Sequence, residues 1–300
     1  MRVLMIGLGD IAHKAYLPVL AAHASVELHL VTRNPEVLAA AGSVYRIPHL
    51  YSGLDEALAA GRFEAAFVHA ATSAHVAIVD ALLSMNIAVF VDKPLAPSYD
   101  QAAALVDKAE RLGVPLFVAF NRRFAPAYAS LRGVPHDTLV MHKHRRQPAG
   151  DIRQTIFDDF IHVVDTLRFF SPAAEQRITI ETTVRQGKLH AVLLSLASAE
   201  HKALGLMNRQ AGLDEERLEL VGPGGRRAVL NLSDTIDYDG AEVLRRRGDW
   251  SSVSMQRGFD AMCAAFLEAV RDHHPVQSQD ILETHRLCEH IVCHAEANAA

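Results

Sequence analysis

The sequence predicts an α/β protein of two domains: an N-terminal doubly wound parallel sheet, then an α+β domain with a large, mostly antiparallel open sheet. Strand-like and helix-like runs alternate through the first 120 residues, which is typical of a parallel sheet with crossover helices. After Asn121, strand-like runs follow one another without helices between them, which indicates antiparallel pairing. A length of 300 residues also suits two domains better than one.

The first domain is predicted to span residues 1–120. Pro18 must bend or interrupt its first helix. Ser52 is expected to cap the third helix, and Ser98 and Gln101 have capping-box spacing at the start of the last helix, which ends at Leu112. The expected strands are 2–6, 26–32, 65–70, 88–91 and 115–120, and the other expected helices are 11–22, 35–41, 54–60 and 74–85.

The second domain is predicted to span residues 121–300. Its strand-like runs lie at 138–144 and between 178 and 244, with turn signals such as Ala211-Gly212. The run His190–Ala197 is apolar on both alternating faces, so we expect one face to cover local helices and the other to contact a second subunit in a homo-oligomer. Expected helices are 156–170, 259–272 and 280–297.

Composition excludes several classes of protein. A formal net charge of -5 leaves no basic excess for phosphates, so nucleic acid is not an expected partner. The three cysteines have no CxxC spacing and cannot form a closed set of disulfides, which suits a reducing cytoplasm. No metal site is expected. We also expect no signal peptide and no membrane span.

A glycine-rich stretch, Gly7-Leu8-Gly9-Asp10-Ile11-Ala12, joins the first expected strand to the first expected helix. There, Gly7 permits a tight turn, Gly9 lets a pyrophosphate approach the backbone, and Ala12 lets the helix lie close to the strand. The N-terminus of the helix, at Asp10 and Ile11, attracts phosphates. The stretch therefore predicts a dinucleotide-binding loop, with a glycine turn that binds no ligand as the alternative.

The end of the second expected strand bears on the type of dinucleotide. An acidic residue there would hold the ribose 2′-hydroxyl of NAD, but the residues are Thr32, Arg33 and Asn34. A guanidinium and a hydroxyl suit a 2′-phosphate. NADP is therefore favoured over NAD as the cofactor, although Arg33 can also be read as a solvated surface charge.

Two sets of ionisable residues are candidates for catalysis. Asp92 and Lys93 directly follow a buried strand, and open α/β sheets bind ligands at the carboxyl ends of their strands. Asp158 and His162 lie four apart in a helical pattern and so share a face, with Asp165 next along it. A carboxylate and an imidazole so placed can hold a substrate hydroxyl and exchange its proton. A strand-end ion pair and a packed histidine are the alternatives.

Basic residues early in the second domain are candidates for substrate recognition. Arg122, Lys143, His144 and Arg145 would suit a phosphate or carboxylate group on a small-molecule substrate. A solvated basic strand explains the same residues equally well.

Together, these motifs resemble the glucose–fructose oxidoreductase / inositol dehydrogenase / MocA (Gfo/Idh/MocA) family over essentially the whole chain. They occur in the order found in that family, and the phrase His162-Val163-Val164-Asp165 looks closest to its bacterial MviM-like branch. The other shared motifs are Gly7-Leu8-Gly9-Asp10-Ile11-Ala12, Ala71-Thr72-Ser73-Ala74-His75, Asp92-Lys93-Pro94 and Asn121-Arg122-Arg123-Phe124.

The resemblance implies an NAD(P)-binding domain and a second domain whose open sheet mediates homodimers or homotetramers. It implies that Lys93 touches both the nicotinamide ribose and the substrate hydroxyl, and that Asp158 and His162 complete the site. Further cofactor contacts implied by the matching motifs are Ala71, Thr72, His75 and Asp92.

The chain departs from the family pattern at three places. The usual Glu-Lys-Pro is Asp92-Lys93-Pro94, which keeps the charge and shortens the reach. Gln154-Thr155-Ile156 replaces the glycine pair that usually precedes the catalytic helix, and Ser73-Ala74 replaces the common Pro-Asn. The latter two departures bear on the shape of the substrate pocket more than on the chemistry.

The expected function is NAD(P)-dependent hydride transfer to or from a secondary alcohol carbon of a sugar or polyol. Lys93 or His162 would accept the hydroxyl proton, and Asp158 would orient the base. A non-catalytic nucleotide-sensing protein and a glycoside-cleaving enzyme with transient redox are the alternatives. The presence of all three residues argues against the sensor.

Overall fold

The computed structural model describes residues 1–171, 177–223, 225–273 and 278–299, and the chain folds into two compact units. The first unit comprises Met1–Ala119 and Phe259–Leu282, and the second comprises Phe120–Gly258 and Glu283–Ala300. The change of unit after Ala119 agrees with the boundary expected near Asn121. The assignment of all later residues to the second domain is corrected, because Phe259–Leu282 returns to the first unit.

Helix α10 (Phe259–Arg271) belongs to the first unit because its apolar face packs against that unit's aromatic side chains. The ring centroid of Phe266 lies 5.3 Å from that of Phe67 and 5.5 Å from that of Phe90. Phe259 lies 5.1 Å from Tyr16 in an edge-on arrangement. Aromatic contacts of this kind are among the larger contributions to a core.

A six-stranded parallel sheet forms the centre of the first unit, in the order β3-β2-β1-β4-β5-β6. The doubly wound fold is thereby confirmed. The order reverses between β1 and β4, and ligands of such sheets bind beside that reversal at the carboxyl ends. The strands are β1 (Arg2–Ile6), β2 (Glu27–Val31), β3 (Leu50–Tyr51), β4 (Ala65–Val68), β5 (Ala88–Val91) and β6 (Leu116–Val118).

The helices of the first unit follow the expected pattern, with one local difference at the start of α3. Pro18 is preceded by a π-helical turn, which interrupts the first helix as expected. Ser98 caps α5 and accepts a hydrogen bond from the Gln101 amide at 3.5 Å, but Ser52 is not the cap of α3; Gly53 is. The elements are η1 (Ala12–Tyr16), α1 (Leu17–Ala21), α2 (Pro35–Tyr45), α3 (Leu54–Ala59), α4 (Thr72–Ser84) and α5 (Tyr99–Leu112).

An eight-stranded sheet forms the second unit, in the order β14-β13-β12-β11-β7-β10-β9-β8. Only the β7–β10 pair among these described strands is parallel, so the expected mostly antiparallel sheet is confirmed. The turn expected at Ala211-Gly212 is instead an irregularity within β11, where Gly212 has a φ of 80°. The strands are β7 (Thr138–Arg146), β8 (Arg177–Arg185), β9 (Lys188–Ala197), β10 (Lys202–Asn208), β11 (Gln210–Gly222), β12 (Gly225–Leu230), β13 (Asp234–Asp239) and β14 (Ala241–Arg245).

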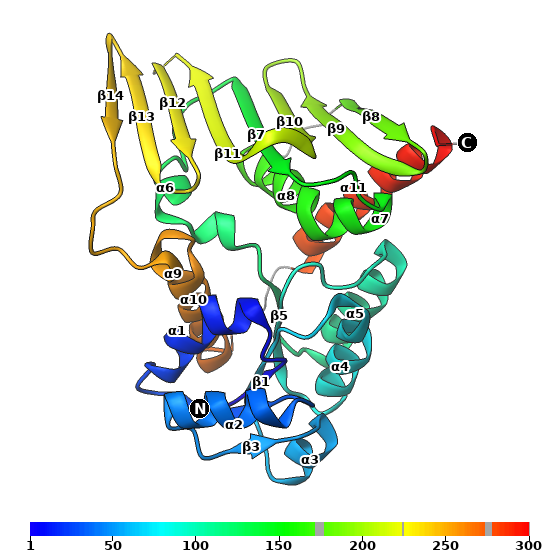
Figure 1. Ribbon diagram of the computed structural model, residues 1–300, viewed down its shortest axis with the longest axis vertical. Helices are drawn as coiled ribbons and strands as arrows, with labels where there is room; N and C mark the ends of the chain where they lie inside the picture. Colours follow the sequence, from blue (N-terminus) through cyan, green and yellow to red (C-terminus); the bar gives the residue numbers. More distant parts are fainter. Residues whose placement is uncertain (172–176, 224, 274–277, 300) are drawn as a thin grey trace. The chain divides into compact units, whose positions relative to one another are not determined.

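Helix α8 covers one face of this sheet (Figure 1). Gly205 of β10 allows the close approach, because a Cβ there would lie 2.5 Å from Val163 of α8. The predicted helix 156–170 is two elements, a π-helical turn and α8. The helices are η2 (Asn121–Phe124), α6 (Pro126–Ala129), α7 (Ile152–Thr155), η3 (Ile156–Phe160), α8 (Ile161–Phe170), α9 (Val253–Gln256) and α11 (Ser278–Ala297).

No helix in the described part of the chain is both long enough and apolar enough to cross a membrane.

Candidate active site

A cavity of about 640 Å³ lies at the carboxyl ends of β1, β2 and β4 in the first unit. Its wall includes the glycine loop Gly7–Gly9, the residues Thr32–Asn34 after β2, and the residues His69–Ala71 after β4. These are the strand ends where a parallel sheet of this order binds a dinucleotide.

The two glycines of the loop differ in what they permit. Gly7 has a φ of 89°, and a Cβ there would lie 2.5 Å from the backbone nitrogen of Ala70, so only glycine fits. A Cβ on Gly9 would meet no atom within 4 Å. Open space over Gly9, next to the start of the helix at Asp10 and Ile11, leaves room for a pyrophosphate.

The residues after β2 place a cation beside the start of α2. The Asn34 side chain caps that helix and accepts hydrogen bonds from the amides of Glu36 at 3.0 Å and Val37 at 3.2 Å. Arg33 is exposed and lines both the main cavity and an adjoining cavity of about 660 Å³, on whose wall Glu36 also lies. Among the described residues that line the main cavity, none is acidic.

His69 is an unsatisfied polar group on the cavity wall. Its side chain is buried, and neither ring nitrogen makes a hydrogen bond to any described residue. The ring stacks on Tyr16 with centroids 3.9 Å apart. Burial lowers the pKa of His69 to about 3, so the ring is neutral and offers one donor and one acceptor. The open glycine loop and this unpartnered histidine fit a bound nicotinamide dinucleotide.

Lys93 follows the carboxyl end of β5, as expected, in a turn stabilised from two sides. The Asp92 carboxylate accepts a hydrogen bond from the Lys93 amide at 2.9 Å. The ring nitrogens of His75 lie 2.8 Å from the Pro94 carbonyl and 2.9 Å from the Ala70 carbonyl. His75 therefore links the Lys93 turn to the cavity loop; it is not on the cavity wall itself.

The other predicted cofactor contacts divide between the cavity wall and its surroundings. Ala71 lines the cavity, whereas Thr72 is the first residue of α4 and does not. The remaining cofactor contacts stay predictions.

Asp158 and His162 belong to the second unit, on the π-helical turn η3 and on the first turn of α8. The backbone carbonyl of His162 accepts a hydrogen bond from the Thr166 hydroxyl at 2.7 Å. Asp165, next along the helix, is buried and paired with Arg123, whose Nε lies 3.0 Å from its carboxylate. This ion pair gives Asp165 a role in holding α8 against η2.

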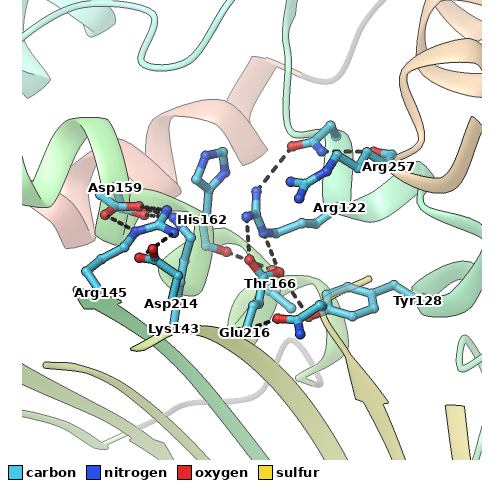
Figure 2. A network of polar contacts seen from close by, with 12 residues as sticks. Arg122, Tyr128, Lys143, Arg145, Asp159, His162, Thr166, Asp214, Glu216 and Arg257 are labelled. Carbon is cyan, nitrogen blue, oxygen red and sulfur yellow. Dashed lines mark hydrogen bonds and ion pairs between the residues drawn. The ribbon is translucent and has the colours of Figure 1, made fainter. Parts of the chain in front are cut away.

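Asp159, which was not a predicted site residue, holds three cations close to Asp158. Its carboxylate contacts Lys143 and accepts two hydrogen bonds of 2.7 Å from Arg145 (Figure 2). It also lies 3.5 Å from Arg209. Burial alone would raise the pKa of Asp159, but the Arg145 hydrogen bonds and the charge of Lys143 lower it well below its usual range. Asp159 is therefore ionised.

Lys143 is at the buried end of this cluster. Burial, then the nearby charges of Arg122 and Arg145, lower the pKa of Lys143 to about 7, although Asp159 and Glu216 oppose the shift. Both the enclosure of the amino group and the two neighbouring guanidinium groups favour the neutral form of the lysine.

Arg122 forms a second buried pair. It donates from Nε and Nη2 to the two carboxylate oxygens of Glu216, at 2.8 and 2.6 Å, and Glu216 also accepts from the Tyr128 hydroxyl at 3.1 Å. In Figure 2 the His162 side chain lies between this pair and the Asp159 cluster. Burial alone would raise the pKa of Glu216, but the charge and hydrogen bonds of Arg122 outweigh it, so the pKa is lowered.

These contacts bear on the residues that were predicted to bind the substrate. Arg122 and Lys143 are buried in ion pairs, so the alternative of a solvated basic strand is wrong for them. Neither Glu216 nor Asp159 was predicted, because each pairs with residues distant in sequence. Glu216 lies directly opposite Lys143 in the β11–β7 register.

Comparisons with known proteins agree with this architecture. Residues 1–120 match the Gfo/Idh/MocA family, described as "Oxidoreductase family, NAD-binding Rossmann fold", and residues 126–238 match "YceM-like, C-terminal domain". YceM of Salmonella typhimurium, named as a candidate oxidoreductase, is 33% identical over 95% of this chain and 92% of its own. The chain belongs to the Gfo/Idh/MocA family of oxidoreductases.

A solved structure and a second relative extend this result. The structure of a Gfo/Idh/MocA family oxidoreductase from Vibrio cholerae superposes with a TM-score of 0.92 at 31% identity, over 99% of this chain and 98% of that one. Myo-inositol dehydrogenase Hyg17 of Streptomyces leeuwenhoekii is 37% identical over 36% of this chain and 37% of its own. The family resemblance and the assignment as an oxidoreductase are confirmed, and dehydrogenases named for myo-inositol and for D-xylose are among the relatives of this chain.

Proposed function

We propose that this protein transfers a hydride reversibly between a nicotinamide cofactor and a secondary alcohol carbon of a sugar, polyol or related small molecule. The observation that supports it most directly is the position of Lys93, after β5 in the unit that carries the nucleotide cavity. The polyol class is supported by the likeness to a myo-inositol dehydrogenase.

The cofactor supplies the hydride chemistry when it is bound, so the protein must orient the alcohol and move one proton. We assign Lys93 to the substrate hydroxyl and the nicotinamide ribose. Asp158 and His162 complete the site, and either Lys93 or His162 accepts the hydroxyl proton. Thr166 and the Asp159 cluster hold the turns that carry Asp158 and His162.

NADP is the cofactor that we favour over NAD. Arg33 stands exposed on the cavity wall after β2 and is suited to a 2′-phosphate. The Asn34 side chain is used by the cap of α2, which leaves Thr32 and Arg33 to contact the 2′-phosphate.

A cytoplasmic location and a homodimer or homotetramer are part of the proposal. The three cysteines are free thiols, as in a reducing compartment. On β9, Leu189, Leu194 and Leu196 are buried, whereas Leu193 on the other face is only half-buried and suits a subunit contact. A monomeric mass in solution at micromolar concentration would contradict the oligomer.

A screen of sugars and polyols, with and without acidic groups, against both cofactors tests the function. Steady production of reduced cofactor is the expected result. Glycoside cleavage without net reduction would instead indicate the transient-redox enzyme, and no turnover with either class would indicate a nucleotide sensor.

A further inference from the structure

A second polar cluster lies in the first unit, at the amino ends of β2 and β3. Glu27 and His29 are two apart on β2 and therefore point to the same face. His49 stands just before β3, and its carbonyl accepts a hydrogen bond from the Leu30 amide at 2.9 Å. The strand pairing thus fixes His49 beside His29.

We propose that Glu27, His29 and His49 bind one divalent transition-metal ion of the zinc class. Glu27 Oε1 lies 3.0 Å from Nε2 of His29 and 3.4 Å from Nε2 of His49, and the three ligand atoms lie within 4.8 Å of one another. A tetrahedral zinc ion with bonds of 2.0–2.1 Å spaces its ligands by about 3.3 Å. The side chains of Glu27 and His49 are half-exposed, so water can take the fourth position.

The surroundings of His29 suit a metal ligand. The Nδ1 atom of His29 lies 3.2 Å from the Tyr51 hydroxyl, which can fix the ring orientation and leave Nε2 for the ion. The side chain of His29 is fully buried and packs edge-on against Phe63 with centroids 5.0 Å apart.

The ligand set also selects the type of ion. Two imidazoles and one carboxylate favour zinc, cobalt, nickel or copper over magnesium and calcium, which prefer oxygen ligands.

Metal binding requires two small rearrangements. The His29 and His49 rings are stacked, with centroids 4.1 Å apart and planes 13° from parallel. The half-exposed His49 ring must therefore rotate until its Nε2 lone pair points at the same ion as that of His29. Arg2 must also withdraw, because its Nε lies 3.4 Å from Glu27 Oε1 and supplies the positive charge that the ion would replace.

This site is separate from the nucleotide cavity. Glu27 is the first residue of β2 and Thr32 directly follows the last one, so the two are about 16 Å apart at ~3.3 Å per residue. A bound ion would join β2 to the segment before the two-residue strand β3 and stabilise that edge of the sheet. The expected effect is on the stability of the first unit, with the cofactor dissociation constant unchanged.

The test is a zinc titration of the tag-free, EDTA-treated protein by calorimetry, with thermal unfolding and cobalt absorption as further measurements. We expect one saturable site per chain, a rise in melting temperature of about 5 °C at a hundredfold excess over the dissociation constant, and the visible absorption of tetrahedral cobalt. His49→Asn should weaken zinc binding about 100-fold and abolish the cobalt band, and Tyr51→Phe should weaken binding about 10-fold.

Two further variants separate this site from adventitious binding. His23→Asn, in the turn before β2, should leave the zinc affinity unchanged, and Arg2→Gln should increase it because the competing cation is gone. Unchanged cofactor binding in every variant shows that the unit is folded. The proposal is overturned if zinc does not saturate one site, or if His49→Asn binds it as tightly as the natural sequence.

Discussion

Lys143 is a buried lysine whose environment predicts a measurable pH dependence. Its pKa is about 7 in the folded chain, below the ordinary value of 10.5. Between these two values the unfolded chain binds the proton and the folded chain does not, so this group makes the free energy of unfolding rise with pH. The slope can reach ~1.4 kcal/mol per pH unit.

Lys143→Met should remove that rise. We expect the difference in unfolding free energy between wild type and variant, measured by urea denaturation, to shift in favour of the wild type as pH rises from 7 towards 9. Lys188→Met removes an exposed lysine and serves as the control, with no pH-dependent difference. A difference for Lys143→Met that does not vary with pH would contradict the assignment.

Arg33 is the residue on which the preference for NADP depends. Arg33→Ala should raise the dissociation constant of NADP by about 10- to 100-fold, the usual loss for a charge-assisted hydrogen bond, and change that of NAD little. Fluorescence titration of both cofactors measures this. Tighter binding of NAD than NADP by the wild type would show that the inference is wrong.

At the residue scale, what the sequence predicts well is local. Gly7 and Lys93 were identified because a buried apolar run directly precedes each of them. The partners of Arg122 and Lys143 were not, because Glu216 lies 94 residues from Arg122 and Asp159 lies 16 residues from Lys143 along the sequence. His49 likewise joins Glu27 and His29 only through the pairing before β3, so the sequence predicts no metal site there.

Among the elements, those bounded by strong local signals match their predicted ends. Strand β5 is Ala88–Val91 as expected, and α5 begins after the Ser98 cap. Strand β3 has two residues, too few for a periodic signal. The π-helical turns η1 and η3 were also not predicted, because a π turn inserts one residue without changing which residues are apolar.

The turn η3 carries Asp158 and is anchored through its neighbour Asp159. Asp159→Asn removes the anion that holds Lys143 and Arg145, so we expect kcat to fall about 10- to 100-fold through misplacement of Asp158. The cofactor dissociation constant should not change, because the nucleotide cavity belongs to the other unit.

Asp214→Asn is the matched control for this prediction. Asp214 is largely exposed and lies 4.0 Å from Arg145, so its loss should leave kcat nearly unchanged. If Asp159→Asn lowers stability but leaves kcat as it is, the cluster has only a structural role.

For the whole molecule, the alternation of strands and helices was enough to predict the fold class. The order of elements along the chain, however, led to α10 being placed in the second domain, although it belongs to the first unit. That helix returns to the first unit because Phe259 and Phe266 complete its aromatic core, a contact that sequence spacing cannot show. The residues of the proposed function come from both units: Lys93 and the nucleotide cavity belong to the first, and Asp158 and His162 belong to the second.

The most direct test of hydride transfer by these residues uses Lys93→Ala and His162→Ala with a substrate found by the screen. Turnover and cofactor dissociation constants are measured for both variants beside the wild type. The account predicts that each variant loses turnover by at least ~100-fold while it binds the cofactor normally. Near-normal turnover by either variant would contradict it.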